Sequence, residues 1–316
     1  MSRKLSSVFA TAALMSSTAL ADVPNVVVDI APVHSLVARV MQDVGAPDLI
    51  IRSGASPHDY RLRPSEAKAL QDANLVIWMG KELTPWMEDA VKTLSTEAAI
   101  LTLLEKDETA LLEFRESVLF EEHDHDDHSD KEHAETEDQD HDEHAHGAHD
   151  PHAWLSPENA KIWLNLIAAQ LSTADPDNAS TYFVNAAAAV TEIDTLMADV
   201  STMLDPIRGN SFIVFHDAYQ YFETVFEFPA SGAISLGDAT DPSPARIARV
   251  QDRIQEQKVQ CVLAEPQFKK GLVVTVLEGT DAKTSIIDPL GVALEPGPAL
   301  YPQLIRNMAK TLVDCF

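Results

Sequence analysis

Histidines are the residues in this chain whose number and spacing point most directly to chemistry. Nine of the twelve histidines lie between Glu121 and His152. Acidic residues fill most of the gaps between them, and Lys131 is the only basic residue in the stretch. Neutral imidazole binds zinc, copper and nickel, and neighbouring carboxylates concentrate cations. The composition therefore indicates a segment that attracts transition metals.

This stretch has no apolar run, so it cannot bury enough surface to offset the entropy of ordering. We predict a disordered loop, rich in His, Asp and Glu, over residues 121–150. A solvated acidic linker is the alternative interpretation, since most charge runs are no more than that. The loop histidines are expected to form an auxiliary metal site of low affinity; they are His123, His125, His128, His133, His141, His144, His146 and His149.

Three further histidines have positions that suit a defined metal site. His58 lies in a loop after a short predicted strand, His216 ends another strand, and His152 precedes a helix that begins at Ser156 and Pro157. In open α/β sheets, ligands bind beyond the carboxyl ends of the strands. We therefore expect the three imidazoles to converge between two lobes. Such a set suits a tetrahedral zinc ion with one position left over.

The hydrophobic pattern predicts the scaffold that positions these histidines. Short β-branched runs alternate with helical periodicity, and the pattern marks four strands in the first half and three in the second. This alternation predicts an α/β fold with parallel sheets. We predict an N-terminal lobe over residues 22–176, a connecting helix over residues 177–205 and a C-terminal lobe over residues 206–316. The helix would be about 40 Å long, which suits a stiff strut.

Residues 1–21 have the pattern of a secretory signal. Arg3 and Lys4 form its basic start, residues 8–15 its apolar middle, and residues 19–21 a small-residue cleavage site. No later run approaches the roughly 20 apolar residues that span a membrane. We therefore predict an exported, periplasmic protein. Loss of the two basic residues takes the formal charge from −27 to −29, which disfavours nucleic acid and anionic lipid as partners and favours cations.

Two cysteines, Cys261 and Cys315, are present. An exported chain with two cysteines is expected to pair them. In the loop-entropy model such a bridge contributes on the order of 4 kcal/mol. Two free buried thiols are the alternative.

Four motifs surround the candidate ligands and carry a resemblance to a known family. They are Gly54–Tyr60 (GASPHDY) with Arg63–Ser65, His152–Pro157 (HAWLSP), Phe215–Tyr219 (FHDAY) and Ala264–Phe268 (AEPQF). Together with the His-rich insertion before the second motif, they make nearly the whole mature chain resemble the zinc-binding solute-binding proteins of ABC importers, the ZnuA type. Any one motif alone would be weak, but the four together are highly specific.

The resemblance implies two (β/α)4 lobes joined by a long rigid helix, with the metal in the cleft between them. It implies that His58, His152 and His216 bind Zn(II) as the transported ligand, and it supports the Cys261–Cys315 disulfide. The implied partners are the membrane permease of a zinc ABC importer with its cytoplasmic ATPase, and a periplasmic zinc chaperone. We expect a monomer that is not an enzyme.

The fourth zinc ligand is left open. Some relatives carry glutamate just before the first ligand histidine, but here that residue is Pro57, which has no donor atom. Water, Asp288 and His34 are the candidates. A structural role is the alternative for both side chains, since His34 lies near a helix start and Asp288 precedes Pro289 in a predicted turn.

Two carboxylates near the ligands are expected to support them. We expect Asp217 to orient His216 or cap a helix, and Glu265 to support the site. Two other functions compete with transport. Three histidines and a water also describe a zinc hydrolase, but no HExxH motif or comparable signature is present. The other alternative is a metal-buffering or adhesion protein without a transporter partner.

Overall fold

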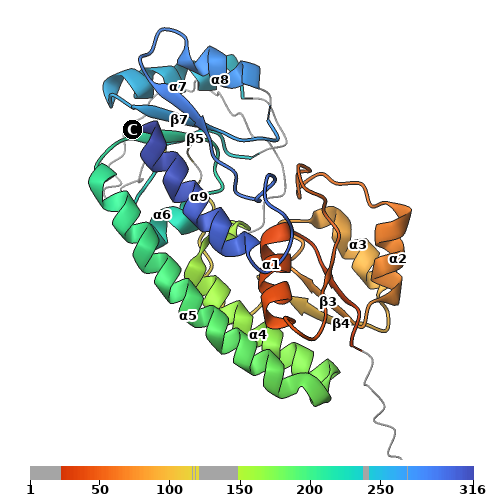
Figure 1. Cartoon of the computed structure of the whole chain (residues 1–316). Helices are drawn as coiled ribbons and strands as arrows, with labels where there is room; N and C mark the ends of the chain where they lie inside the picture. The colour runs from red at the N-terminus through yellow and green to blue at the C-terminus, as the bar shows by residue number, and fades with distance from the viewer. Residues whose placement is uncertain (1–22, 116, 118, 121–148, 238–241, 269) are drawn as a thin grey trace, which may run out of the picture.

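The computed structural model describes residues 23–115, 117, 119–120, 149–237, 242–268 and 270–316. The predicted signal over residues 1–21 and most of the predicted loop, residues 121–148, lie outside this set. Within it, two four-stranded parallel sheets are flanked by helices (Figure 1). No helix in this set is both long enough and apolar enough to cross a bilayer.

The N-terminal lobe contains the first sheet, with strand order β2-β1-β3-β4. Its apolar runs are fully buried in the two central strands, as expected where helices cover a parallel sheet. Each of its three helices has proline in the first turn, where no helical hydrogen bond is lost. The elements are β1 (Val26–Val28), α1 (Ala31–Val40), β2 (Asp48–Leu49), α2 (Pro64–Asp72), β3 (Leu75–Trp78), α3 (Pro85–Leu94) and β4 (Ala99–Thr102).

The C-terminal lobe contains the second sheet, whose order β6-β5-β7-β8 places its strands as in the first. The hydrophobic pattern predicts three of these strands and misses β6, because three residues after a glycine are too few to show a period. The elements are β5 (Phe212–His216), α6 (Gln220–Phe226), β6 (Ala233–Ser235), α7 (Pro244–Glu256), β7 (Cys261–Ala264), α8 (Lys270–Leu277), β8 (Lys283–Ile286) and α9 (Leu300–Cys315).

Strand β5 shows how the second sheet divides its core. Successive side chains of a strand point to opposite faces. Phe212 and Val214 join the large hydrophobic cluster, whereas Ile213 and Phe215 join a small cluster under α7 and α8. The large cluster extends from β1 to α9 without a break, so the two lobes are packed on one continuous core.

Helices α4 (Pro157–Ala174) and α5 (Ala179–Leu204) link the lobes. At about 1.5 Å per residue, the 26 residues of α5 span about 39 Å, which agrees with the predicted strut. Figure 1 shows α5 along one side of the molecule, with α9 crossing from the C-terminal lobe toward α1. At that crossing the backbone N–H of Tyr301 donates to Ser35 Oγ at 2.9 Å.

The predicted disulfide between Cys261 and Cys315 is present. It joins the first residue of β7 to the last residue of α9. Because α9 also packs on α1 and α5, the bridge fastens a helix shared by both lobes to the sheet of one of them.

Candidate metal centre

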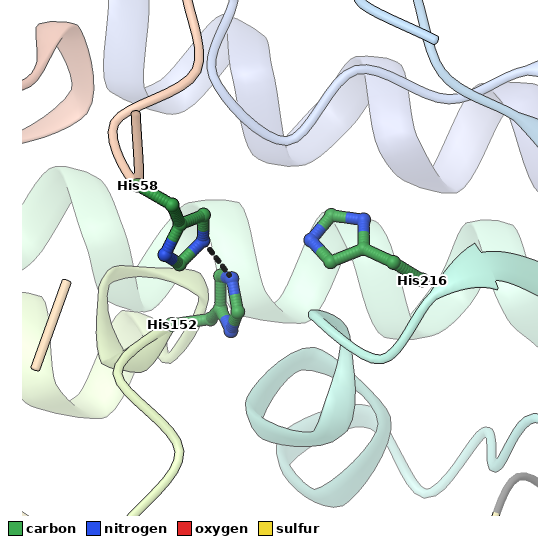
Figure 2. Close-up of side chains that lie close together, drawn as sticks. All are labelled: His58, His152 and His216. Carbon is green, nitrogen blue, oxygen red and sulfur yellow. Dashed lines mark hydrogen bonds between the residues drawn. The ribbon is translucent and has the colours of Figure 1, made fainter. Parts of the chain in front are cut away.

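The three histidines that the sequence singles out come together between the lobes (Figure 2). His58 lies in the loop after β2, His152 just before a short turn that leads into α4, and His216 at the carboxyl end of β5. One nitrogen from each ring lies within 4.8 Å of the other two. His152 and His216 are buried, and His58 is half-buried.

The separations suit zinc. A Zn–N distance of about 2.0–2.1 Å in a regular tetrahedron places neighbouring nitrogens about 3.3 Å apart. His58 Nε2 and His152 Nε2 are 3.3 Å apart. The third nitrogen, on His216, lies within 4.8 Å of both. Each of these two separations therefore exceeds the tetrahedral value by at most about 1.5 Å.

A buried carboxylate holds each of the two buried imidazoles. Asp150 Oδ1 accepts from His152 Nδ1 at 2.7 Å and from the His152 backbone N–H at 2.9 Å. Glu265 Oε1 accepts from His216 Nδ1 at 2.6 Å. A carboxylate opposite Nδ1 favours the tautomer with its proton on Nδ1, which leaves the Nε2 lone pair for a metal. Gln267 Nε2 in turn donates to Glu265 Oε2 at 2.7 Å.

Glu265 supports His216 as the sequence predicts, whereas Asp217 and Asp150 differ from the sequence-based expectation. Asp217, which we expected to orient His216 or cap a helix, instead binds Arg115, and Glu265 contacts His216. Asp150, placed by the sequence in the disordered segment, is buried with 1% of its surface exposed. The predicted segment therefore ends earlier, since His149 also forms a bridge with Glu113. A useful signal for Asp150 is its place two residues before His152.

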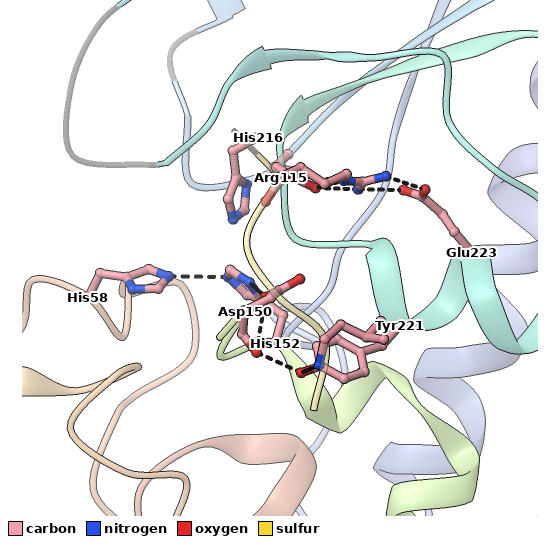
Figure 3. Close-up of polar contacts among 10 residues, drawn as sticks. His58, Arg115, Asp150, His152, His216, Tyr221 and Glu223 are labelled. Atoms are coloured by element: carbon pink, nitrogen blue, oxygen red, sulfur yellow. Dashed lines mark hydrogen bonds and ion pairs between the residues drawn. The ribbon is translucent and has the colours of Figure 1, made fainter. Parts of the chain in front are cut away.

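Arg115 was not singled out from the sequence, although it is the only basic residue between Lys106 and Lys131. It forms ion pairs with Asp217 and with Glu223 of α6, as Figure 3 shows for Glu223. Burial raises the pKa of both carboxyls, and the guanidinium opposes that rise. Burial alone would lower the pKa of Arg115, but its hydrogen bonds to the two carboxylates raise it.

Burial also raises the pKa of Asp150 to about 7, against the opposing effect of its hydrogen bond from the His152 backbone. The site thus combines three imidazoles, two of them buried, with carboxylates that lie out of water. A bound dication is favoured in such surroundings, because it interacts with anionic groups that bulk water does not screen.

Helix α3 positions His58 through its loop. The indole Nε1 of Trp86 donates to the carbonyl oxygen of Pro57 at 2.8 Å. The Ser56 hydroxyl accepts the backbone N–H of His58 at 3.2 Å. Gly54, with φ of +85°, supplies the left-handed backbone that turns the loop toward the site. The hydrogen bond from Trp86 was not predicted from the sequence.

The start of α4 positions His152. Ser156 caps this helix, with its Oγ accepting the Asn159 N–H at 3.2 Å, as its sequence predicts. Trp154 in the preceding turn donates its indole N–H to the carbonyl of Pro289, and its own carbonyl accepts from Tyr301. Both partners belong to the C-terminal part of the chain, so the turn after His152 is held from across the molecule.

Neither side-chain candidate for the fourth ligand joins the cluster that the described residues form. His34 lies in α1, with Nε2 on the carbonyl of Pro47 at 3.0 Å, and burial lowers its pKa. Asp288 Oδ1 accepts two backbone N–H groups in the turn that follows it, which is the structural role named as its alternative. Water as the fourth ligand stays a prediction.

Of the eight loop histidines predicted to form an auxiliary site, His149 is exposed and lies in the bridge with Glu113. The other seven, His123 through His146, lie outside the described residues.

Solved structures share the fold over nearly the whole chain. One described as a crystal structure of ZnuA has a TM-score of 0.74 at 20% identity and covers 93% of this chain and 99% of that one. A zinc-bound ZnuA with residues 138–173 deleted has the same TM-score and identity. The match covers 93% of this chain and 98% of that one. A mutant laminin-binding adhesin of Streptococcus agalactiae has a TM-score of 0.73 at 22% identity. The match covers 92% of this chain and 98% of the adhesin. At these identities the matches concern the fold.

Sequence relatives are more similar. The high-affinity zinc uptake system protein ZnuA of Paracoccus denitrificans is 48% identical, covering 98% of this chain and 96% of that protein. The protein of the same name from Brucella abortus is 43% identical, and the match covers 92% of this chain and 91% of that protein. The family model described as zinc-uptake complex component A, periplasmic, matches residues 26–315. With this match over almost all of its length, the chain belongs to the ZnuA family, whose members are zinc-uptake components and not enzymes.

Proposed function

We propose that the protein captures Zn(II) in the periplasm and delivers it to the membrane permease of a zinc ABC importer. The observation that carries this proposal is the convergence of His58, His152 and His216 from two lobes. Three imidazoles suit zinc over magnesium or calcium, which take oxygen ligands. The names of the relatives support zinc as the cargo. Removal of residues 1–21 on export would release the mature chain into that compartment.

In this proposal the Nε2 atoms of His152 and His216 bind the ion, His58 contributes a third nitrogen, and water occupies the fourth position. Asp150 and Glu265 make their imidazoles more basic and fix the rings. Since protons compete with zinc for imidazole nitrogen, affinity should fall as pH falls below about 6.5.

Release is proposed to occur on docking, through a small displacement of the loop that carries His58. That loop is held by hydrogen bonds to Pro57 and Ser56, whereas α5 and the shared core resist a wide hinge motion. A cytoplasmic ATPase would drive the permease, and a periplasmic zinc chaperone could supply the ion. The loop histidines would act as an auxiliary zinc collector or sensor.

Isothermal titration calorimetry with zinc tests the proposal. Three mature proteins would be compared: wild type, a variant without residues 121–147, and the triple variant His58→Ala/His152→Ala/His216→Ala. We expect the deletion to retain one tight site and the triple variant to lose it. Retention of one tight site by the triple variant, with its loss in the deletion, would show instead a loop-based metal buffer.

A further inference from the structure

One short segment, Leu112–Arg115, connects both lobes beside the three histidines (Figure 3). It follows β4 of the N-terminal lobe, and its end contacts the C-terminal lobe. Arg115 donates from Nε to Asp217 at 2.9 Å and from Nη1 to Glu223 at 2.8 Å, and Nη2 contacts both carboxylates. All three guanidinium nitrogens are thus bound, and the group also lies 3.5 Å from the ring centroid of Phe120.

The other end of the segment is bound to the same helix and to Asp150. The Tyr221 hydroxyl of α6 accepts the Leu112 N–H at 3.0 Å and donates to the Asp150 carbonyl at 2.8 Å. The Asp150 N–H donates back to the Leu112 carbonyl at 2.8 Å. One tyrosine hydroxyl therefore fastens both the segment and the residue that orients His152.

The two ends of the segment act on two different ligands. At one end Tyr221 and Leu112 hold Asp150, whose carboxylate binds His152. At the other end Arg115 holds Asp217, which follows His216 directly in the chain. His152 and His216 approach the site from different lobes, so their separation depends on how firmly this connection is held.

Building on the proposed zinc site, we propose that Arg115 and Tyr221 form an inter-lobe brace, with Arg115 as a positioning residue that sets the separation of His152 and His216. The brace comprises Leu112–Arg115 and Tyr221. Arginine suits this place because its planar fork can bind two carboxylates at once, which a lysine ammonium cannot match in geometry. The side chains of Asp217 and Glu223 are 3% and 4% exposed, so these contacts are shielded from competing water.

A substitution of Arg115 changes the local charge as well as the contacts of the brace. Removing the guanidinium alone would leave two buried carboxylates without a counter-charge, which destabilises a fold strongly. The triple variant Arg115→Met/Asp217→Asn/Glu223→Gln removes the three charges together and keeps similar side-chain volumes. Tyr221→Phe removes the hydroxyl alone and keeps the ring, so it tests the other end of the brace in a variant that retains the core packing.

Zinc affinity by competition titration and the visible d–d spectrum of the cobalt(II)-loaded protein would be measured on both variants. Loss of partners around metal ligands typically weakens binding by about 10–100-fold, and we expect that range for the triple variant and about 2–10-fold for Tyr221→Phe, the loss of a hydrogen bond. We expect a changed cobalt spectrum in both, since the spectrum reports ligand geometry and not fold stability.

The matched control is Arg39→Met/Glu192→Gln, which removes a two-bond ion pair near the last turn of α1 and should leave zinc affinity and the cobalt spectrum unchanged. A triple variant that binds zinc within twofold of wild type, with an unchanged spectrum, overturns the role of Arg115. If the triple variant does not fold, Tyr221→Phe decides the question. Zinc binding by Tyr221→Phe within twofold of wild type, with an unchanged cobalt spectrum, overturns the proposal of an inter-lobe brace. If wild type itself loses no zinc affinity when the three histidines become alanine, the proposed function fails instead.

Discussion

Carboxylates decide how the two buried imidazoles face the site. Asp150 and Glu265 each accept from an Nδ1 atom, so the chain fixes the orientation of His152 and His216 before any metal arrives. Because these acceptors are ionisable and buried, we expect their negative charge, as well as their hydrogen bonds, to affect how strongly the imidazoles bind zinc. The contribution of that charge can be measured apart from the hydrogen bond.

Replacing Glu265 with glutamine tests this point. The amide oxygen can still accept from His216, but the negative charge that makes the imidazole more basic is lost. We expect zinc affinity to fall by about 10-fold or more, measured by competition with a chelating indicator. Glu256→Gln, at the exposed end of α7, is the control and should bind as wild type. An unchanged affinity in Glu265→Gln would rule out a role for the charge.

Asp29 gives a pH dependence that is independent of the candidate metal ligands. Its two carboxyl oxygens accept the Ile30 and Met79 backbone N–H groups, and burial raises its pKa from 3.8 to about 7. The folded chain thus retains a proton that the unfolded chain releases. The stability from this proton is complete below about pH 4 and is lost as pH rises through about 7.

The variant Asp29→Asn lacks this titration but loses one backbone acceptor, at a cost of about 1–3 kcal/mol. We expect its stability relative to wild type to improve between pH 5 and pH 8. Urea unfolding of both metal-free proteins at the two pH values measures this. A difference between the proteins that does not vary with pH would contradict the assignment.

The sequence singles out the three candidate ligand histidines because each lies in a motif, with His58 and His216 at strand ends and His152 before a helix. It predicts Glu265 as a supporting carboxylate but assigns the orientation of His216 to Asp217 and misses Asp150 as the partner of His152. Asp217 follows His216 directly, so its proximity suggested an orienting role, but adjacent side chains at a strand end point in different directions. Glu265 follows the end of the neighbouring strand β7, and its contact with His216 depends on the order of the strands in the sheet.

At the scale of elements, α3 holds the loop of His58 by one indole hydrogen bond. Trp86→Phe keeps an aromatic ring in place and removes the donor to Pro57. A hydrogen bond contributes about 0.5–1.5 kcal/mol, so we expect zinc affinity to fall about 2–10-fold, mainly through faster dissociation. Stopped-flow measurement of zinc release to a chelator would show it. Equal dissociation rates in variant and wild type would mean that other contacts hold the loop.

The disulfide lies away from the proposed metal site. Cys261 starts β7 and Glu265 follows its end, about 13 Å apart at about 3.3 Å per residue. We expect Cys261→Ala/Cys315→Ala to lower the free energy of unfolding by about 2–4 kcal/mol, with zinc affinity unchanged. Denaturant unfolding and calorimetry on the same sample separate the two effects. A parallel loss of affinity would show that α9 transmits strain to the site.

Most elements follow from the sequence, since apolar runs and proline at helix starts mark them. The exception is β6, which is defined by its pairing with β5 and not by its own three residues. Likewise, the sequence-based boundaries between lobes stay a prediction. α9 was assigned to the C-terminal lobe, yet it packs on α1 and α5 as well as on β8.

At the scale of the whole molecule, the continuous core and α5 predict a shape that changes little when zinc binds. Small-angle scattering of the metal-free and zinc-loaded protein should give radii of gyration that agree within error. A clear decrease on loading would show a hinge closure of the lobes and would contradict the proposed release through the His58 loop.

The crossing of α9 over α1 also affects when the chain can fold during its synthesis. The large apolar cluster includes residues from β1 and residues from α9, so the first half of the chain has no complete core until the last helix has been synthesised. A product that stops at residue 205 would expose the apolar faces of α1 and α5. Such a chain is expected to stay open and to be degraded. Complete folding is therefore expected only after the whole chain has been synthesised.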